Sequence, residues 1–360
     1  MIVTVTPNPA LDLTWQVERL IPGGTHRAPT GRSRAGGKGL NVARVAHAEA
    51  AEVCAVATAG GTTGEEFSAE LRSSGVPHAL VPVRASTRRS VALVDEAAGD
   101  TTIVNERGTA PSAEEWAAVR RAVADAVSRA ASPVLVVAGS IPPGAPEGLV
   151  EDLVRWGRTA GATVIADTSG PALLRAADAG AHVLKPNAAE LREATGHEDP
   201  LAGAAELIRR GAELILLSQG PDGMLAVVSP RFGAPDGADG PQGGPRDPEM
   251  RPESGEGGGP GEGRIRILRA RLAEPLAGNP TGAGDAAVAA CAVLLARGVR
   301  DPLTLLRRAT AWSAAAVLMP LAGEIHPSWP QLEAALLIDS PTGHASDPRA
   351  TTAPEPKDTP

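Results

Sequence analysis

Short runs of β-branched and aliphatic residues alternate along the chain with longer segments rich in alanine and leucine. The short runs are apolar throughout, as in strands whose two faces are both covered. They occupy residues 2–6, 53–60, 133–140, 162–169, 181–187 and 212–220. Helical stretches such as 113–130 and 149–160 separate most of these runs. The pattern predicts an α/β protein with a mainly parallel central sheet that helices cover on both sides.

Two kinds of segment break this pattern. Residues 86–106 read as strand, polar turn and strand, and with residues 12–20 they predict a small antiparallel sheet outside the main one. We expect this sheet to be a lid, contributed by about 12–35 and 86–107, on a single domain that spans 1–338. Residues 230–263 hold Gly, Pro and charge with almost nothing to bury, which predicts a flexible insertion. The tail 339–360 is expected to be disordered.

The composition excludes several function classes. The net charge of −8 does not suggest a nucleic-acid or anionic-membrane surface. Cys54 and Cys291 form no CxxC pattern, which indicates a reduced cytoplasm and no structural zinc. The opening MIVTVTPNPALD has no basic n-region, so no signal peptide is expected. The longest apolar run, 286–296, is half a membrane span. We expect a cytoplasmic protein.

The stretch GNPTGAGDAAVAACAVLLARG, residues 278–298, offers three interpretations. It matches a dinucleotide fingerprint formally, but no strand leads directly into it. It could be a plain helix start, with Thr281 as the cap and Asp285 in the first turn. Its two glycines also suit an anion hole, in which backbone N–H groups hold a phosphoryl group beside a carboxylate base. That pairing suits phosphoryl transfer to an alcohol.

Two further motifs each have a functional and a structural interpretation. AGGKGLNVARVAHA, residues 35–48, fails the P-loop pattern because position 32 is Arg and Lys38 precedes Gly39. It is a glycine-rich turn into a helix, and alone it could carry an exposed lysine only. In KPNAAEL, residues 185–191, Asn187 and Glu190 resemble a capping box. They also follow a strand at the sheet edge where α/β proteins bind ligands, and their oxygens could hold Mg²⁺.

Together the motifs resemble those of the ribokinase-like PfkB carbohydrate kinases, over residues 1 to about 330. GGKGLNVARV is similar to the first signature of that family, PTGAGDAAVAA to the second, and KPNAAEL to its Asn-x-x-Glu segment. VTPNPALD, STRRS and GSIPPG resemble the branch of 1-phosphofructokinases and tagatose-6-phosphate kinases. The resemblance implies a three-layer α/β/α fold with a small antiparallel β lid. Ala286 and Ala287 depart from the family pattern, which affects helix packing more than chemistry.

The resemblance also implies a role for each site residue. Asp285 is the catalytic base, and the N–H groups of Gly282, Ala283 and Gly284 form the anion hole. The residues expected to bind the sugar phosphate are Asp12, Gly37, Lys38, Asn41, Arg88 and Asn105. Arg88 is the lid arginine on the phosphate, and Arg89 should point to the opposite strand face. The residues expected on the nucleotide side are Lys185, Asn187, Ser218, Gly220, Gly223 and Thr281. Asn187 and Glu190 organise Mg²⁺, directly or through water.

The implied activity is ATP-dependent phosphorylation of a phosphorylated ketohexose, with fructose 1-phosphate as the first choice of acceptor. Tagatose 6-phosphate, fructose 6-phosphate and an unphosphorylated sugar remain alternatives, because Lys38 and Arg88 favour a phosphorylated acceptor without naming it. A protein that binds a nucleotide or sugar phosphate without catalysis is a third possibility, although the base and its surroundings are present. In this family the lid often forms a dimer contact, so a homodimer through the lid is expected.

Overall fold

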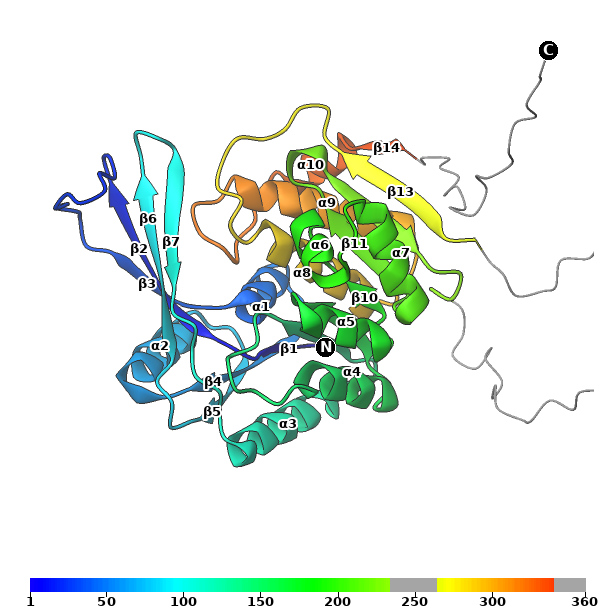
Figure 1. The fold of residues 1–360 in the computed structure, drawn as a ribbon, viewed down its shortest axis with the longest axis horizontal. Coiled ribbons are helices and arrows are strands. Elements are labelled where there is room, and N and C mark those ends of the chain that lie inside the picture. Colours follow the sequence, from blue (N-terminus) through cyan, green and yellow to red (C-terminus); the bar gives the residue numbers. More distant parts are fainter. Residues whose placement is uncertain (234–263, 340–360) are drawn as a thin grey trace, which may run out of the picture.

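A long, twisted sheet forms the middle layer of the molecule (Figure 1). In the computed structural model, which describes residues 1–233 and 264–339, ten strands build this sheet in the order β14-β13-β12-β11-β10-β9-β8-β1-β4-β5. The seven strands from β11 to β5 are parallel, and β12, β13 and β14 extend one edge in antiparallel pairs. The expectation of a mainly parallel sheet is confirmed. In spatial order the strands are β14 (Leu337–Asp339), β13 (Arg266–Arg271), β12 (Met224–Val228), β11 (Leu214–Ser218), β10 (Val183–Leu184), β9 (Thr163–Asp167), β8 (Val134–Ala138), β1 (Ile2–Thr6), β4 (Val53–Ala59) and β5 (His78–Pro82).

Both faces of the sheet are buried, which explains the uninterrupted apolar runs. Side chains along each strand alternate between two cores: Ile2 packs into one, whereas Val3 and Val5 pack into the other. The helices whose buried side chains line the first core are α1 (Lys38–Ala48), α2 (Gly61–Ser73), α8 (Ala283–Ala296) and α9 (Pro302–Val317), with α10 (Trp329–Ala334) beside them. The helices on the second core are α3 (Ala113–Val127), α4 (Leu149–Thr159), α5 (Pro171–Asp178), α6 (Ala188–Thr195) and α7 (Pro200–Arg210).

Helix α8 is the most deeply placed helix of the site. Its residues from Asp285 to Leu295 are all buried, and five of these eleven are alanine. Small side chains allow it to pack closely against α1 and α9 and against the strands β1 and β8. Helix α8 is not part of a βαβ unit. The loop 272–282 separates it from the preceding strand, and the next element is helix α9 and not a strand. The dinucleotide interpretation of residues 278–298 is therefore wrong.

A second sheet of four strands projects from one end of the main sheet (Figure 1). Its order is β3 (Arg32–Gly36), β2 (Ala10–Val17), β6 (Arg88–Asp95) and β7 (Asp100–Asn105). The expected lid sheet is present, and it begins two residues before the expected start. Its pairs β2–β3 and β6–β7 are antiparallel, whereas β2–β6 is parallel. The parallel pair arises because β2 follows β1 and β6 follows β5, so the chain enters the lid twice from the same edge of the main sheet.

Two expected segments fall largely outside the described residues. The insertion predicted at 230–263 is described only for 230–233, between β12 and β13, and the tail predicted at 339–360 only for its first residue. Within the described part of the chain, no helix has the length and apolar character needed to cross a membrane.

Candidate active site

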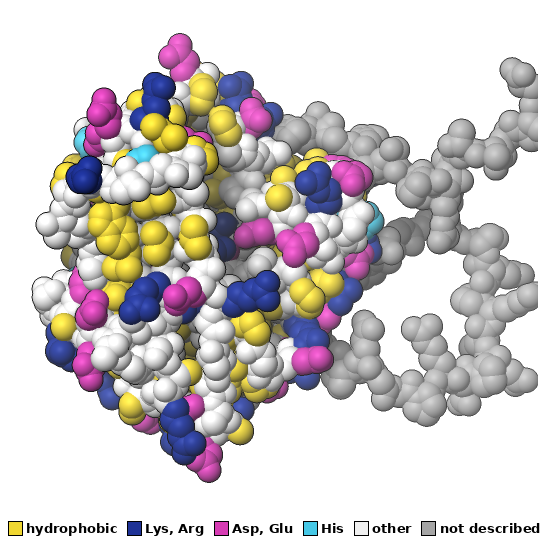
Figure 2. Space-filling view, turned by 60° about the vertical axis from the view of Figure 1, so that its left-hand side comes forward, with side chains coloured by type: hydrophobic (Ala, Val, Ile, Leu, Met, Phe, Trp, Pro, Cys, Tyr) yellow, Lys and Arg dark blue, Asp and Glu magenta, His cyan; other side chains and the backbone are white. Residues whose placement is uncertain are grey.

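One cavity of about 940 Å³ lies between the lid and the carboxyl edge of the main sheet. Figure 2, which brings the lid side of Figure 1 forward, shows a hollow in which basic and acidic side chains lie beside a band of hydrophobic ones. The cavity brings together residues that are far apart along the chain. Among its lining residues are all seventeen expected from the sequence: Asp12, Gly37, Lys38, Asn41, Arg88, Asn105, Lys185, Asn187, Glu190, Ser218, Gly220, Gly223, Thr281, Gly282, Ala283, Gly284 and Asp285.

The start of helix α8 forms one wall of the cavity. Gly282 is the N-cap residue, with φ of 85° and no side-chain capping bond, so Thr281 does not cap the helix as one interpretation expected. A Cβ atom at Gly282 would lie 2.8 Å from Ala322, which leaves no room for a larger residue. The N–H of Ala283 donates to the Pro280 carbonyl at 3.2 Å, whereas those of Gly282 and Gly284 bond to no acceptor in the described chain. Free N–H groups at a helix start suit an anion.

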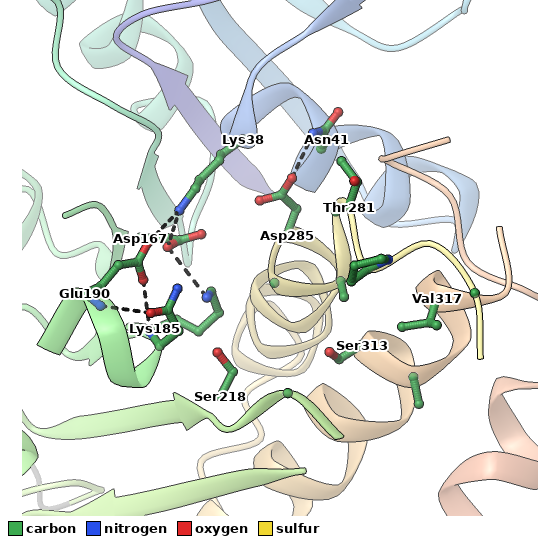
Figure 3. Close-up of a pocket in the computed structure, with 18 of the residues that line it drawn as sticks. Lys38, Asn41, Asp167, Lys185, Glu190, Ser218, Thr281, Asp285, Ser313 and Val317 are labelled. Carbon is green, nitrogen blue, oxygen red and sulfur yellow. Dashed lines mark hydrogen bonds and ion pairs between the residues drawn. The ribbon is translucent and has the colours of Figure 1, made fainter. Parts of the chain in front are cut away.

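Asp285 lies in the first turn of α8 and is 6% exposed. The amide of Asn41 on α1 donates to its Oδ2 at 2.7 Å, so Asn41 holds the carboxylate that the sequence analysis assigned as the base (Figure 3). Burial, and next the negative charge of Asp167, raise the pKa of Asp285 to about 7. A carboxyl group with a pKa near neutrality is suited to accept a proton from a hydroxyl group.

A cluster of charged side chains lies beside Asp285 at the ends of β9 and β10 (Figure 3). The Nζ of Lys38 is 3.1 Å from Asp167 Oδ1 and 3.5 Å from Glu190 Oε1, and Lys185 Nζ is 3.7 Å from Asp167 Oδ1. Burial disfavours the charged ammonium of Lys38, but nearby carboxylates, Asp167 first among them, outweigh it and raise its pKa. Lys38 and Lys185 thus place two basic side chains at the cavity wall, where a phosphate would be stabilised.

The glycine-rich turn before α1 places Asp12 against the backbone. A Cβ atom at Gly36 would overlap the Asp12 carboxylate, and Gly37 has φ of 115°. Burial raises the pKa of Asp12 to about 6, although the positive charges of Arg88 and Arg34 oppose the shift. The Asp12 carboxyl group can thus accept a hydrogen bond from a ligand hydroxyl at the lid end of the cavity.

Arg88 reaches the cavity from β6 and is held by backbone carbonyls. Its Nε donates to the carbonyl of Asn8 at 3.2 Å and its Nη1 to that of Glu106 at 3.0 Å. Burial lowers the pKa of Arg88, and the negative charge of Asp12 opposes this shift only in part. Arg89 is exposed and is not among the residues that line the cavity, as the alternation of side chains along a strand predicts. Asn105, which pairs with Ser90 across the lid sheet, lies beside Arg88 on the same wall.

Asn187 and Glu190 form a complete capping box at the start of α6. Asn187 Oδ1 accepts from the Glu190 N–H at 2.8 Å, and Glu190 Oε2 accepts from the Asn187 N–H at 2.9 Å. The structural interpretation of this motif is therefore correct, and it uses one oxygen of each side chain. Glu190 Oε1 remains directed to the cavity, near Lys38. Direct ligation of Mg²⁺ by Asn187 Oδ1 would compete with its capping bond, whereas Glu190 Oε1 could bind the ion or its hydration water with the capping box intact.

The far end of the cavity is mainly apolar. Ser218, Gly220 and Gly223 lie there with Met224 from β12, Leu272 and Leu276 from the loop before α8, and Ser313 and Val317 from α9. A slot of this kind suits a flat apolar base or ring, with few side chains that could read its edge.

Sequence reasoning missed several lining residues. Asp167 is fully buried, and its Oδ2 has no hydrogen-bond partner within the described chain. Its place at the carboxyl end of a predicted strand was a usable signal. Asn8, whose amide donates to Ser140 Oγ and to the carbonyl of Arg107, carried no such signal. Among described residues, no group of three or more His, Cys, Asp or Glu side chains could hold a metal ion by itself.

Comparison with known proteins gives a consistent result. Residues 8–236 match the family model described as "pfkB family carbohydrate kinase". A 1-phosphofructokinase of Xanthomonas campestris is 34% identical over 325 residues, which cover 86% of this chain and 89% of that protein. An ATP-dependent 6-phosphofructokinase isozyme 2 of Mycobacterium tuberculosis is 36% identical over 63% of this chain and 68% of that protein.

Solved structures agree with the sequence relatives. The phosphofructokinase-2 of Escherichia coli in complex with fructose-6-phosphate superimposes with a TM-score of 0.73 and 26% identity. The match covers 92% of this chain and 98% of that one. The three-layer architecture and the small sheet at its end are thus those of the similar enzymes.

Proposed function

Because the chain belongs to the PfkB family of carbohydrate kinases, which transfer a phosphoryl group to an alcohol, we propose that it phosphorylates fructose 1-phosphate with ATP as donor. The broader statement, a phosphofructokinase-type kinase of a sugar phosphate, follows from the relatives named above. The observation that carries the proposal is the pairing of Asp285 with the free N–H groups of Gly282 and Gly284 at the start of α8. A base and an anion hole less than one helical turn apart suit in-line phosphoryl transfer.

The acceptor is proposed to lie at the lid end of the cavity. Lys38 and Arg88 supply positive charge for the phosphate that the sugar already carries, and Asp12 and Asn105 supply hydrogen-bonding groups for its hydroxyls. The name of the Xanthomonas relative supports fructose 1-phosphate. The name of the Mycobacterium relative supports fructose 6-phosphate as the second candidate, which carries its phosphate at the other end of the same sugar.

The nucleotide is proposed to lie at the apolar end, with its phosphates directed toward Gly282 and Lys185. Asn187 and Glu190 would hold the hydration shell of Mg²⁺ beside these phosphates. The bound ion would neutralise phosphate charge. Thr281, Ser218, Gly220 and Gly223 would contact the nucleotide.

The reaction requires little covalent chemistry from the protein. Asp285 accepts the proton of the acceptor hydroxyl as that oxygen forms its bond to the γ-phosphorus, and the bond to ADP breaks. The N–H groups of Gly282 and Gly284 hold the equatorial oxygens of the transferred group. The lid excludes water, which would otherwise compete as the acceptor.

The proposal is tested by ADP release from the purified protein with Mg²⁺ and ATP. The acceptor panel holds fructose 1-phosphate, fructose 6-phosphate, tagatose 6-phosphate, fructose and ribose. We expect the highest turnover with fructose 1-phosphate. Turnover only on a free sugar would contradict the phosphate-binding role of Lys38 and Arg88. ATP binding without ADP release on any acceptor would favour the non-catalytic alternative.

Arg88→Ala should raise KM for fructose 1-phosphate by about tenfold to a hundredfold, because it removes a partly buried charge from the phosphate site. KM for ATP should stay near that of the unmodified enzyme. Arg89→Ala is the matched control, since Arg89 is the next residue on the same strand and faces away from the cavity. Equal effects of the two substitutions on KM for the sugar phosphate would refute the assignment of Arg88.

The pH dependence of kcat/KM should have an acid limb near pH 7. Asp285 must be ionised to accept a proton, and its pKa is raised to about 7, so the rate should fall about tenfold for each pH unit below that value. The phosphate group of the acceptor also titrates, but its second ionisation lies near pH 6. An acid limb near pH 7 can therefore be assigned to Asp285 and not to the phosphate. A rate that stays constant down to pH 6 would contradict the raised pKa of the base.

We also propose that two copies associate through the lid. The edge strand β7 offers unpaired N–H and carbonyl groups to another chain, and its Val104 is 60% exposed. The light-scattering mass of the purified protein tests this proposal. A monomer at all concentrations would reject it.

A further inference from the structure

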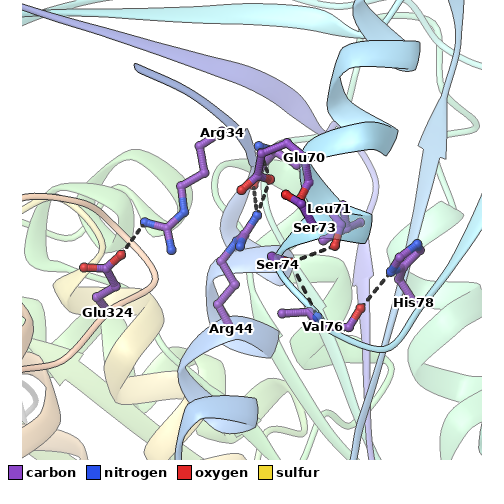
Figure 4. Close-up of polar contacts among 10 residues, drawn as sticks. Arg34, Arg44, Glu70, Leu71, Ser73, Ser74, Val76, His78 and Glu324 are labelled. Carbon is purple, nitrogen blue, oxygen red and sulfur yellow. Dashed lines mark hydrogen bonds and ion pairs between the residues drawn. The ribbon is translucent and has the colours of Figure 1, made fainter. Parts of the chain in front are cut away.

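An ion pair that does not line the cavity lies at the base of the lid (Figure 4). Arg44 on α1 and Glu70 on α2 are 2.5 Å apart, between Nη2 and Oε2. The Arg44 side chain is 7% exposed. Burial lowers the pKa of Arg44, although the charge of Glu70 opposes the shift. Burying such a pair is costly, so its place in the fold calls for a physical reason.

Both charged groups bind the backbone of one residue of the lid. Glu70 Oε2 accepts from the N–H of Ala35 at 2.8 Å, and Arg44 Nη2 donates to the carbonyl of Ala35 at 3.1 Å. Ala35 is buried in β3, which is an edge strand of the lid sheet. Its N–H and carbonyl are therefore satisfied as a neighbouring strand would satisfy them. The ion pair takes the place of a missing strand at one point of the edge.

The residues that follow Ala35 form the acceptor end of the site. Gly36 and Gly37 make the turn against Asp12, and Lys38 begins α1. Arg44 lies on that same helix, six residues after Lys38, and Asn41, which lies between them, holds Asp285. The Arg44–Glu70 pair thus fixes strand β3, which leads into the turn, to helix α1, which follows the turn. Any shift of β3 relative to α1 would move Gly36 and Asp12 relative to Lys38.

Among the described residues, Arg44 packs against Gly323, which lies beside Gly282, but the pair has no hydrogen bond or ion pair to the nucleotide side. Its lining residues come from β11, β12, the loop before α8 and helix α9, and neither Arg44 nor Glu70 bonds to them among the described residues. A disturbance of the pair should therefore reach the acceptor end of the cavity first.

We propose that Arg44 and Glu70 are positioning residues that set the distance between the lid strand β3 and helix α1, and with it the affinity for the acceptor. The inference depends on the proposed function only in placing the acceptor at the lid end. A pair with a purely structural role would affect stability and leave the ratio of the two KM values unchanged.

The experiment compares Glu70→Gln with Glu66→Gln, which neutralises an exposed carboxylate one turn earlier on the same helix. For Glu70→Gln we expect KM for fructose 1-phosphate to rise about tenfold or more, with KM for ATP within about twofold of the original. Hydrogen exchange should become faster in peptides that cover 32–36 and stay unchanged in those that cover 214–228. Glu66→Gln should match the unmodified enzyme in all three measurements.

Two results would overturn the inference. One is a parallel change, or no change, in both KM values, and the other is exchange in 32–36 that stays at the original rate. Arg44→Lys serves where Glu70→Gln does not fold, because it keeps the charge but loses the planar fork that bridges Glu70 and Ala35. If the unmodified protein does not use fructose 1-phosphate, the proposed acceptor fails. The exchange measurement then decides the role of the pair on its own.

Discussion

Replacing Asp285 by asparagine should leave a folded protein that binds ATP and turns over its acceptor about a hundred to ten thousand times more slowly. The amide keeps the size of the carboxylate and can still accept the bond from Asn41, but it cannot take up the hydroxyl proton. Stability should not fall, because the carboxylate is buried and its raised pKa shows that its charged form is disfavoured there.

The measurement is steady-state ADP formation with saturating ATP and acceptor, beside a thermal melt and an ATP titration. Asp222→Asn is the matched control, since Asp222 is an exposed acid near the nucleotide end that does not line the cavity. Its rate should equal that of the unmodified enzyme. A turnover within a few-fold of the original in Asp285→Asn would remove Asp285 from the role of base.

Replacing Asp167 by asparagine should lower the free energy of unfolding by about 3 kcal/mol or more, because it leaves buried positive charge without its carboxylate. Lys185 is 4% exposed and Asp167 is fully buried, so water cannot replace the lost partner. The acid limb of kcat/KM should also move to lower pH, since the negative charge of Asp167 contributes to the raised pKa of Asp285.

Urea denaturation measures the first effect and the pH profile the second. Asp125→Asn on α3 is the control, as this acid is exposed in the last turn of the helix and should change stability by less than about 0.5 kcal/mol. If Asp167→Asn were as stable as the control, water would have to replace Asp167 as the partner of Lys38 and Lys185, and the predicted loss of stability would be refuted. A pH profile that shifts upward would contradict the electrostatic coupling between the two carboxylates.

The sequence allowed the main sheet, the lid and the residues of the cavity to be predicted for a simple reason. The buried strands are short and apolar, and loops that follow parallel strands meet at one edge of a sheet. Residues such as Lys185 and Asn187 are recognisable from their place after a strand. Asp285 is recognisable from the two glycines before it.

The missed features depend on contacts between distant segments. Nothing near Glu70 in the chain indicates that its carboxylate binds Ala35 and Arg44. The parallel pairing of β2 with β6 depends on where two strands of the main sheet end. The cap expected at Thr281 was wrong because the tight approach of Gly282 to Ala322, forty residues later, sets the start of the helix.

The depth of helix α8 has a consequence for the order in which a newly made chain can fold. The ribosome delivers β1 long before α8, and β1 lies inside the sheet, between β8 and β4. The helix α8, which packs on β1, β8 and α1, emerges only after all of these elements and β13 have been made. Until α8 has been made, the apolar face that it buries is exposed, and the nascent protein is prone to aggregate through it. The same order means that a translation product that ends before α8 lacks Asp285, and with it the proposed base.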